Sequence, residues 1–273
     1  MNASKERVFY YHADASPIGG FFTRPAEHLI PSHGSSSLAQ AGGNAAARVS
    51  GYRLDSLISF DHAYSEIYGT ANKTTGTWTT TVTSVVEGLN VAETVTADRV
   101  VAVLTVEHPT DGGFPRASVV GSQFVNLRVG GVPMNPVLGQ STITNHEVGK
   151  FPATAVIDDE KFVANAFGQY ERLTSATGAP DWLKKRYEWM QSPETRKRKG
   201  YVICSLVDRV PEAKQENTFG HVLHVPDFGN IFLSELLTDQ HTFRLTMIRM
   251  EMGCANEGTV SIGTSDSNGA GAP

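Results

Sequence analysis

The chain has 273 residues, of which 40% are hydrophobic, and a formal net charge of −5 at pH 7. A chain of this length can bury a sizeable core as one body. Its slightly acidic charge provides no overall field that would attract nucleic acid or an anionic membrane. No apolar stretch approaches the roughly 20 residues that a spanning helix needs, so we expect no membrane span. Residues 1–12 lack the apolar region of a secretory signal, which predicts a protein that is cytoplasmic, or exported by a route without a classical signal peptide.

The two cysteines, Cys204 and Cys254, do not form a Cys-x-x-Cys pair. In a chain without an export signal, this arrangement favours reduced, partly buried thiols over a disulfide. It gives no support to zinc or redox chemistry, and we expect no cofactor.

Residues 45–132 read as strands separated by turns. Residues 79–87 alternate small polar and branched side chains, and 108–113 break the pattern with Pro and paired Gly. A weak internal repeat is present: Ser84-Val-Val and Ser118-Val-Val are each followed by Leu-x-Val. Short apolar triplets broken by Gly and Asn suit stacked coils. We therefore predict an all-β body that is either β-solenoid-like or a β-sandwich. The weak internal repeat slightly favours the solenoid-like fold.

The organisation along the chain predicts one β-rich body, residues 1–273, with an insertion and a tail. Residues 159–200 show the apolar spacing of helices and form a short helical, basic excursion. Strands return from residue 201, and residues 243–252 alternate apolar and polar side chains. The small, polar residues 265–273 are predicted to be a flexible tail.

The helical excursion carries the strongest charge asymmetry of the chain. Aromatic side chains lie among its cations, as in a nucleic-acid or anionic-lipid contact. The favoured interpretation is a solvated segment whose cations meet the acidic body of a neighbouring subunit, and nucleic acid is the less favoured partner. The candidate contact residues are Lys184, Lys185, Arg186, Arg196, Lys197, Arg198 and Lys199.

The most metal-like group of residues is His221, His224 and Asp227. Two imidazoles and a carboxylate can form a three-ligand site with an open position for water. Residues three apart on a strand point to opposite faces, however, so the spacing argues against a shared ion. No nucleophile elbow, Walker loop or dinucleotide-binding fingerprint occurs, which predicts no catalytic residues.

Two segments resemble a known family: Val95-Thr-Ala-Asp-Arg-Val-Val-Ala, and Gly121-Ser-Gln-Phe-Val-Asn-Leu-Arg-Val-Gly-Gly131. They are similar to phrases of secreted bacterial proteins of the choice-of-anchor P type, as is the closing strand from Phe243 to Ser261. The resemblance covers about half the chain in short motifs. It implies an all-β, non-enzymatic surface or scaffold protein, and it supplies no catalytic residues. The chain departs from the family by lacking a signal peptide and a C-terminal anchor, and by carrying the helical excursion.

Three functions follow as expectations. The first is a structural or self-assembling protein, a homo-oligomer whose strand edges or helical excursion contact other copies. The second is a carbohydrate-binding module or a polysaccharide-acting hydrolase, with Tyr64, Tyr68 and Trp78 as an aromatic platform. The third is a metal-dependent enzyme that uses His221, His224 and Asp227.

Overall fold

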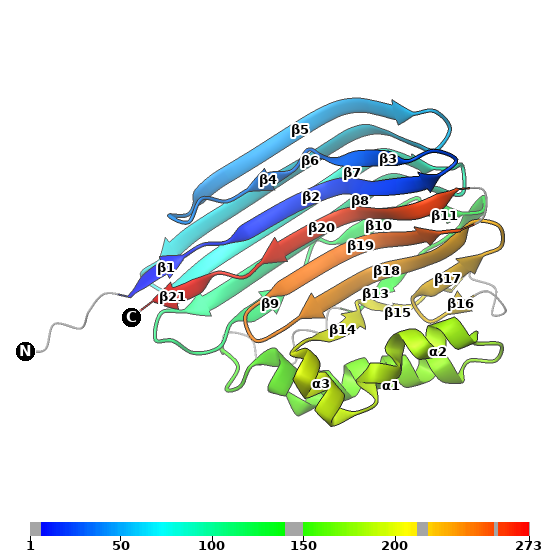
Figure 1. Ribbon diagram of the computed structural model, residues 1–273. Coiled ribbons are helices and arrows are strands. Elements are labelled where there is room, and N and C mark those ends of the chain that lie inside the picture. The colour runs from blue at the N-terminus through cyan, green and yellow to red at the C-terminus, as the bar shows by residue number, and fades with distance from the viewer. Residues whose placement is uncertain (1–6, 140–149, 212–217, 254–255, 273) are drawn as a thin grey trace, which may run out of the picture.

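The computed structural model describes residues 7–139, 150–211, 218–253 and 256–272. Most of these residues lie in two antiparallel sheets that pack face to face, with helices along one side (Figure 1). The prediction of an all-β body with a helical insertion is therefore confirmed at the level of fold class. Among the described residues, no helix is long and apolar enough to cross a membrane.

The first sheet is a meander of four long strands whose neighbours in sequence are neighbours in space. Their alternation of buried and exposed residues explains why they form strands with one face on the core. The sheet runs in the order β12 (Val132–Pro133), β11 (Arg128–Val129), β8 (Val95–Pro109), β7 (Thr77–Val91), β6 (Ile58–Asn72) and β5 (Gly43–Leu54), and β9 (Arg116–Ser118) and β10 (Gln123–Val125) also pair with β8.

The second sheet joins the two ends of the chain, because β2 lies beside β20. Its order is β16 (Thr218–Phe219), β17 (Val222–Val225), β18 (Gly229–Thr238), β19 (Phe243–Met252), β20 (Glu257–Ser267), β2 (Ala13–Arg24) and β3 (His28–His33); β14 (Val202–Ser205) pairs with β18 and β4 (Ser36–Ser37) with β2. Two small sheets pair β1 (Val8–Tyr10) with β21 (Ala270–Ala272), and β13 (Val137–Leu138) with β15 (Val207–Arg209).

The core lies between the two sheets, where β2, β19 and β20 face β6, β7 and β8. Fully buried aliphatic and aromatic side chains from both sheets meet there, including Ile18, Val86, Leu104, Phe243 and Ile262. Each buried side chain of this size stabilises the fold by about 1.5–3 kcal/mol through removal of apolar surface from water.

A shared irregularity crosses the second sheet and changes which side chains face the core. On β19, Leu245 is buried and Thr246 faces outward, whereas farther along Ile248 is buried and Arg249 faces outward. The change of phase occurs at Met247, opposite Ser234 (φ 48°) on β18 and Gly263 (φ 63°) on β20. Without this change of phase, the strand period of two would direct Arg249 into the core.

The helical excursion packs beside the second sheet, next to β14 and β16. In α1, residues Phe162, Ala166, Tyr170 and Leu173 form one buried face, and the side chain of Asp159 caps the start by accepting a hydrogen bond from Phe162 N (2.8 Å). The elements are η2 (Val156–Asp158), α1 (Glu160–Ser175), α2 (Asp181–Tyr187), η3 (Glu188–Met190) and α3 (Pro193–Lys199).

The expected flexible tail at 265–273 is wrong for the described residues 265–272. Ser265 to Ser267 are buried in the last part of β20, and β21 pairs with β1 at the end of the body where both termini lie (Figure 1). Small residues are required here because larger ones would collide: a Cβ on Gly269 would lie 2.5 Å from the Phe9 ring. The composition that suggested a linker therefore reflects close packing.

Phe9 lies in the pair of β1 with β21 and stacks on Trp78 at 4.9 Å between ring centroids. We expect Phe9→Ala to lower the free energy of unfolding by about 3 kcal/mol, since a buried aromatic side chain leaves a cavity. Tyr10→Ala is the matched control, because Tyr10 lies on the same strand but is 50% exposed, and its replacement should cost less than 1 kcal/mol. Urea unfolding measured for both variants checks the difference, and equal losses would contradict the assigned packing.

Candidate functional site

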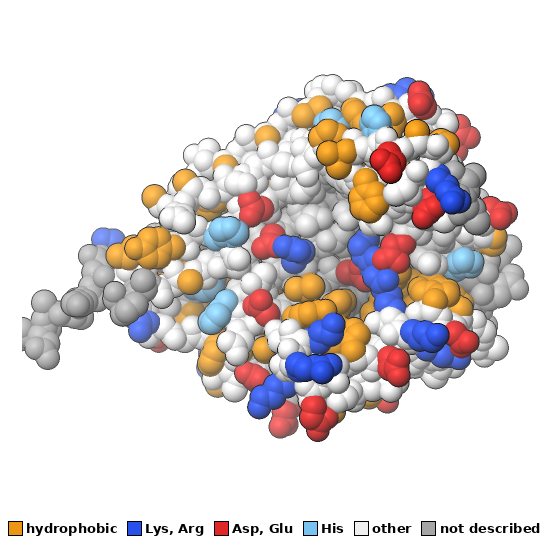
Figure 2. Space-filling view, viewed as in Figure 1, with side chains coloured by type: hydrophobic (Ala, Val, Ile, Leu, Met, Phe, Trp, Pro, Cys, Tyr) orange, Lys and Arg blue, Asp and Glu red, His pale blue; other side chains and the backbone are white. Residues whose placement is uncertain are grey.

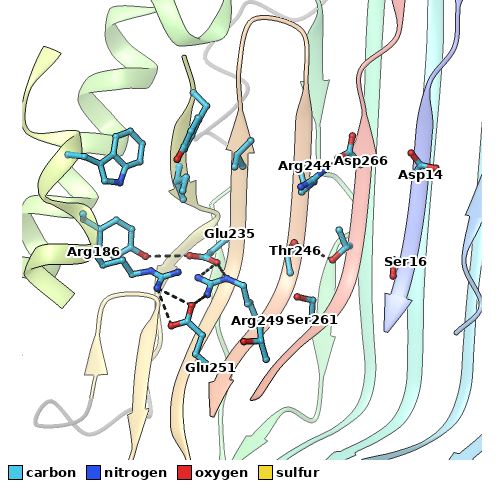
Figure 3. A pocket seen from close by; sticks show the side chains of 17 residues that line it. Asp14, Ser16, Arg186, Glu235, Arg244, Thr246, Arg249, Glu251, Ser261 and Asp266 are labelled. Atoms are coloured by element: carbon cyan, nitrogen blue, oxygen red, sulfur yellow. Dashed lines mark hydrogen bonds and ion pairs between the residues drawn. The ribbon is translucent and has the colours of Figure 1, made fainter. Parts of the chain in front are cut away.

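A groove of about 740 Å³ crosses the outer face of the second sheet, between the helical excursion and β2. In Figure 2, charged side chains surround the hollowed middle of this face. Figure 3 shows the groove from close by, with the strands β18, β19, β20 and β2 forming its base.

Hydroxyl side chains form the floor of the groove. Thr246, Thr264 and Ser16 are partners in register across β19, β20 and β2, so their side chains follow one row on the outer face. Ser261 and Thr259 continue the floor beyond the irregularity at Gly263. The hydroxyls of such a row can both donate and accept hydrogen bonds.

A network of two arginines and two glutamates forms the wall next to the helices. Arg249 Nε donates to Glu235 Oε2 (2.6 Å), and its Nη1 also pairs with Glu251. Arg186, from α2, donates from Nη1 to Glu251 Oε2 (3.1 Å) (Figure 3). The side chains of Arg249 and Glu235 are only 18% and 11% exposed. Burial of each charge is tolerated because the opposite charge of its partner compensates it.

The two arginines of the network also cover an aromatic ring. Phe232, fully buried on β18, has the guanidinium carbon of Arg249 4.0 Å and that of Arg186 4.4 Å from its ring centroid. Cations over an aromatic face are attracted by its quadrupole. The network therefore anchors α2 onto the sheet, which explains why a charged side chain of the excursion lies at the groove.

The network continues inward to Tyr187 and His221. The Tyr187 hydroxyl lies 3.4 Å from both Glu235 Oε1 and His221 Nε2. Burial, and then the charge of Glu235, raises the pKa of Tyr187. Burial, followed by the guanidiniums of Arg249 and Arg186, lowers the pKa of His221 to about 3. For Arg249, burial alone lowers the pKa, but Glu235 and Glu251 outweigh it and the pKa is raised.

Two aspartates lie on the other side of the floor. Arg244, Asp266 and Asp14 are cross-strand partners in one row of the outer face. Arg244 Nε donates to Asp266 Oδ2 (2.6 Å), and Asp14 accepts a hydrogen bond from the Ser37 hydroxyl. Asp14 remains about half exposed, so its carboxylate is available to a ligand in the groove.

Aromatic side chains stand at the end of the groove beside the helices. Trp189 of η3 and Tyr201 are both half-buried, with ring centroids 5.1 Å apart and planes tilted by 59°. The Nζ of Lys199 lies 5.9 Å from the Trp189 ring centroid. Both rings line the groove, where a ligand can contact their apolar surface.

The charges around the groove are nearly balanced and internally paired. Three arginines face four carboxylates among the lining residues. Each of the three, Arg186, Arg244 and Arg249, has a carboxylate partner. The lining residues therefore offer no unpaired arginine to an anionic ligand.

The expected metal residues are not brought together. His221 is buried against Tyr187, whereas His224 lies on β17 with its Nδ1 2.9 Å from Asn230 Oδ1. Asp227 is exposed in the turn before β18. Within the part of the chain that the structure describes, no three His, Cys, Asp or Glu side chains form a metal-binding group. His221 lies in the turn before β17 and His224 lies on that strand.

The basic residues of the excursion divide into an internal one and an exposed set. Arg186 does not share the exposure of the other candidate contact residues, because its side chain is half-buried and pairs with Glu251. The side chain of Arg196 lies outside the described residues. Lys184, Lys185, Lys197, Arg198 and Lys199 are exposed.

The expected aromatic platform is also corrected. Tyr64 and Tyr68 lie on the outer face of the first sheet, where Tyr64 donates to Glu87 Oε1 (3.2 Å) and Tyr68 is 49% exposed. Trp78 points to the opposite face, since it pairs with Ala71 and stacks on the buried Phe9. The three rings therefore cannot form one surface.

The groove residues that sequence reasoning missed come mainly from β19 and β20. A signal was present in the segment Met247-Ile248, where two adjacent apolar residues interrupt the alternation and shift Arg249 and Glu251 to the same face as Thr246. The pairing of β20 with β2, which lies near the other end of the chain, has no local signal.

Comparison with known proteins gives one family. A family described as a domain of unknown function (DUF8256) matches residues 9–239. No curated protein and no solved structure matches the chain. The match ends near the end of β18, so the groove residues of β19 and β20 lie beyond it.

Proposed function

Because the chain belongs to the DUF8256 family, a domain of unknown function, we propose a function from the groove itself: binding of a neutral saccharide. The observation that supports this proposal is the row of hydroxyls in the floor, flanked by paired charges and by the aromatic rings of Trp189 and Tyr201. A saccharide offers hydroxyls that donate to carboxylates and accept from hydroxyls, and apolar ring faces for Trp189 and Tyr201. The groove volume of about 740 Å³ falls within the usual range of ligand sites.

The proposal is binding without cleavage. Hydrolysis of a glycosidic bond needs one carboxyl group that carries a proton to the leaving oxygen and a second that acts as base or nucleophile. In the groove, Glu235, Glu251 and Asp266 are each engaged by an arginine. This arrangement supports a binding surface, in keeping with the non-enzymatic role that the resemblance to choice-of-anchor P proteins implies.

We also infer that the two-sheet body is a β-sandwich rather than a solenoid. All the strand pairs of the two large sheets are antiparallel over the described residues, as in β6 with β7 and β18 with β19. Solenoids of the β-helix type stack parallel strands in successive coils. A sandwich also explains why the core lies between two sheets rather than inside one continuous coil.

A glycan array tests the proposed function. We expect wild-type protein to bind neutral oligosaccharides and not their sulfated forms. Trp189→Ala should weaken binding at least tenfold, since loss of a ligand-contacting aromatic costs more than about 1.4 kcal/mol. Tyr68→Ala is the control, because it removes an exposed aromatic from the other sheet and should leave binding unchanged. An array without neutral hits, or binding that depends on Tyr68, contradicts the proposal.

A further inference from the structure

The two large sheets differ in how their outer strands are protected. In the described residues, the main strand order ends at β12 and β5 in the first sheet, and at β16 and β3 in the second. β12 and β16 have two residues each, and the six residues of β3 include Pro31. Short strands and proline are common means by which proteins prevent pairing at sheet edges. Three of the four edges are protected in this way.

The fourth edge, β5, has none of these features. It has twelve residues without proline and pairs along its length with β6, its one hydrogen-bonded neighbour among the described residues. Figure 1 shows it as the outermost strand of the first sheet. In an antiparallel pair, about half of the peptide groups of a strand point away from its neighbour, so β5 presents a row of backbone donors and acceptors to another strand.

We propose that β5 pairs antiparallel with β5 of a second copy, about a two-fold axis at Ala47. Such an interface is isologous and closed, and it joins the first sheets of the two copies into one continuous sheet. The axis places Val49 opposite Ala45 of the partner subunit and Arg48 opposite the partner's Ala46. Apart from Arg48, the side chains that face each other across the axis are small or uncharged.

Charge fixes the register and favours a second copy over an unrelated strand. On β6, Glu66 is the exposed partner of Ala46 on the outer face. In the joined sheet, Arg48 therefore lies two strands from the partner subunit's Glu66, with only the methyl group of the intervening Ala46 between them. Two Arg–Glu pairs form by symmetry. An axis at Arg48 would instead set two guanidiniums directly opposite each other, which is unfavourable.

Charge reversal with rescue tests this interface by size-exclusion chromatography with light scattering. We expect wild-type protein to form a dimer, and Arg48→Glu or Glu66→Arg to raise the dimer dissociation constant at least tenfold. The double variant should regain the dimer, because the pair is restored with its signs exchanged. Arg48 and Glu66 are exposed, so all three variants are expected to fold.

Cysteine cross-linking tests the position of the axis. Ala47→Cys places two thiols directly across the axis, at a Cα separation that a disulfide can span, and oxidation should give a covalent dimer. Ala45→Cys is the control, since its two thiols lie about 13 Å apart along the paired strands. Wild-type protein oxidised in the same way shows how much covalent dimer forms through the two native cysteines alone.

A strictly monomeric wild type overturns the inference. It is also overturned if the dimer persists in both single charge variants, or if it breaks only when Arg196, Lys197, Arg198 and Lys199 are replaced by glutamate. The last result would assign assembly to the helical excursion. None of these results bears on the saccharide groove, which lies on the other sheet.

Discussion

Replacing Arg249 with alanine is expected to lower the free energy of unfolding by about 3–5 kcal/mol, because it leaves Glu235 buried without its ionic partner. Glu235 is 11% exposed, and its remaining contact is the Tyr187 hydroxyl at 3.4 Å. The same substitution removes the guanidinium from the Phe232 ring. Equilibrium unfolding in guanidinium chloride measures the loss.

Two further variants show whether the buried charge is the cause. Arg24→Ala removes an arginine that is 68% exposed and lies 3.3 Å from Glu257, and it should cost less than about 1 kcal/mol. The double variant Arg249→Met with Glu235→Leu should recover most of the stability, since apolar replacements of a buried ion pair are often neutral. If the double variant is as unstable as Arg249→Ala, the loss comes from packing rather than from the unpaired charge.

Acidification from pH 7 to pH 4 is expected to destabilise the fold by several kcal/mol through two buried histidines. Burial, and then the charge of His241, lowers the pKa of His108 to about 4, and the pKa of His221 is about 3. Both values lie below the ordinary value of about 6.5. As the pH falls below 6.5, the unfolded chain therefore takes up protons that the native state does not. Each histidine contributes about 3 kcal/mol of lost stability by pH 4.

Urea unfolding at pH values between 7.5 and 4.5 tests this dependence. His108→Phe should reduce the slope of stability against pH over this range, because it removes one titrating group while keeping an aromatic ring next to Phe9. His28→Gln is the control and should keep the wild-type slope, since His28 is exposed. A wild-type stability that is constant from pH 6.5 to 4.5 contradicts the neutral, buried state of these histidines.

The fold class could be predicted from local pattern, because it depends on alternation along single strands. Residues 79–87 carry this alternation, as do residues 243–252 apart from the break at Met247-Ile248, and the helical spacing in residues 159–175 corresponds to α1. The tail was predicted wrongly because small residues mark both linkers and tight packing. At Gly269, the nearby Phe9 ring shows that tight packing is the reason for the small residue. Phe9 and Gly269 are far apart in sequence, so the sequence alone does not reveal this contact.

The groove could not be predicted because its residues meet only through long-range pairing. Asp14 and Asp266 are neighbours across β2 and β20 although 252 residues separate them. The sequence groups Arg186 with Lys184 and Lys185 as candidate contact residues, because the three are consecutive cations. One helical turn holds side chains on different sides, and that of Arg186 faces Glu251. Charge runs in sequence therefore do not identify which members are paired in the fold.

The crystal structure of the protein soaked with a neutral oligosaccharide selected on the glycan array tests the central proposal most directly. We expect the sugar to lie along the hydroxyl floor formed by Thr246, Thr264 and Ser16, with one ring against Trp189 and hydroxyls near Asp14. The Arg249–Glu235 pair should remain intact in the complex. A sugar bound on the outer face of the first sheet, beside Tyr64 and Tyr68, would show that the groove is not the saccharide site.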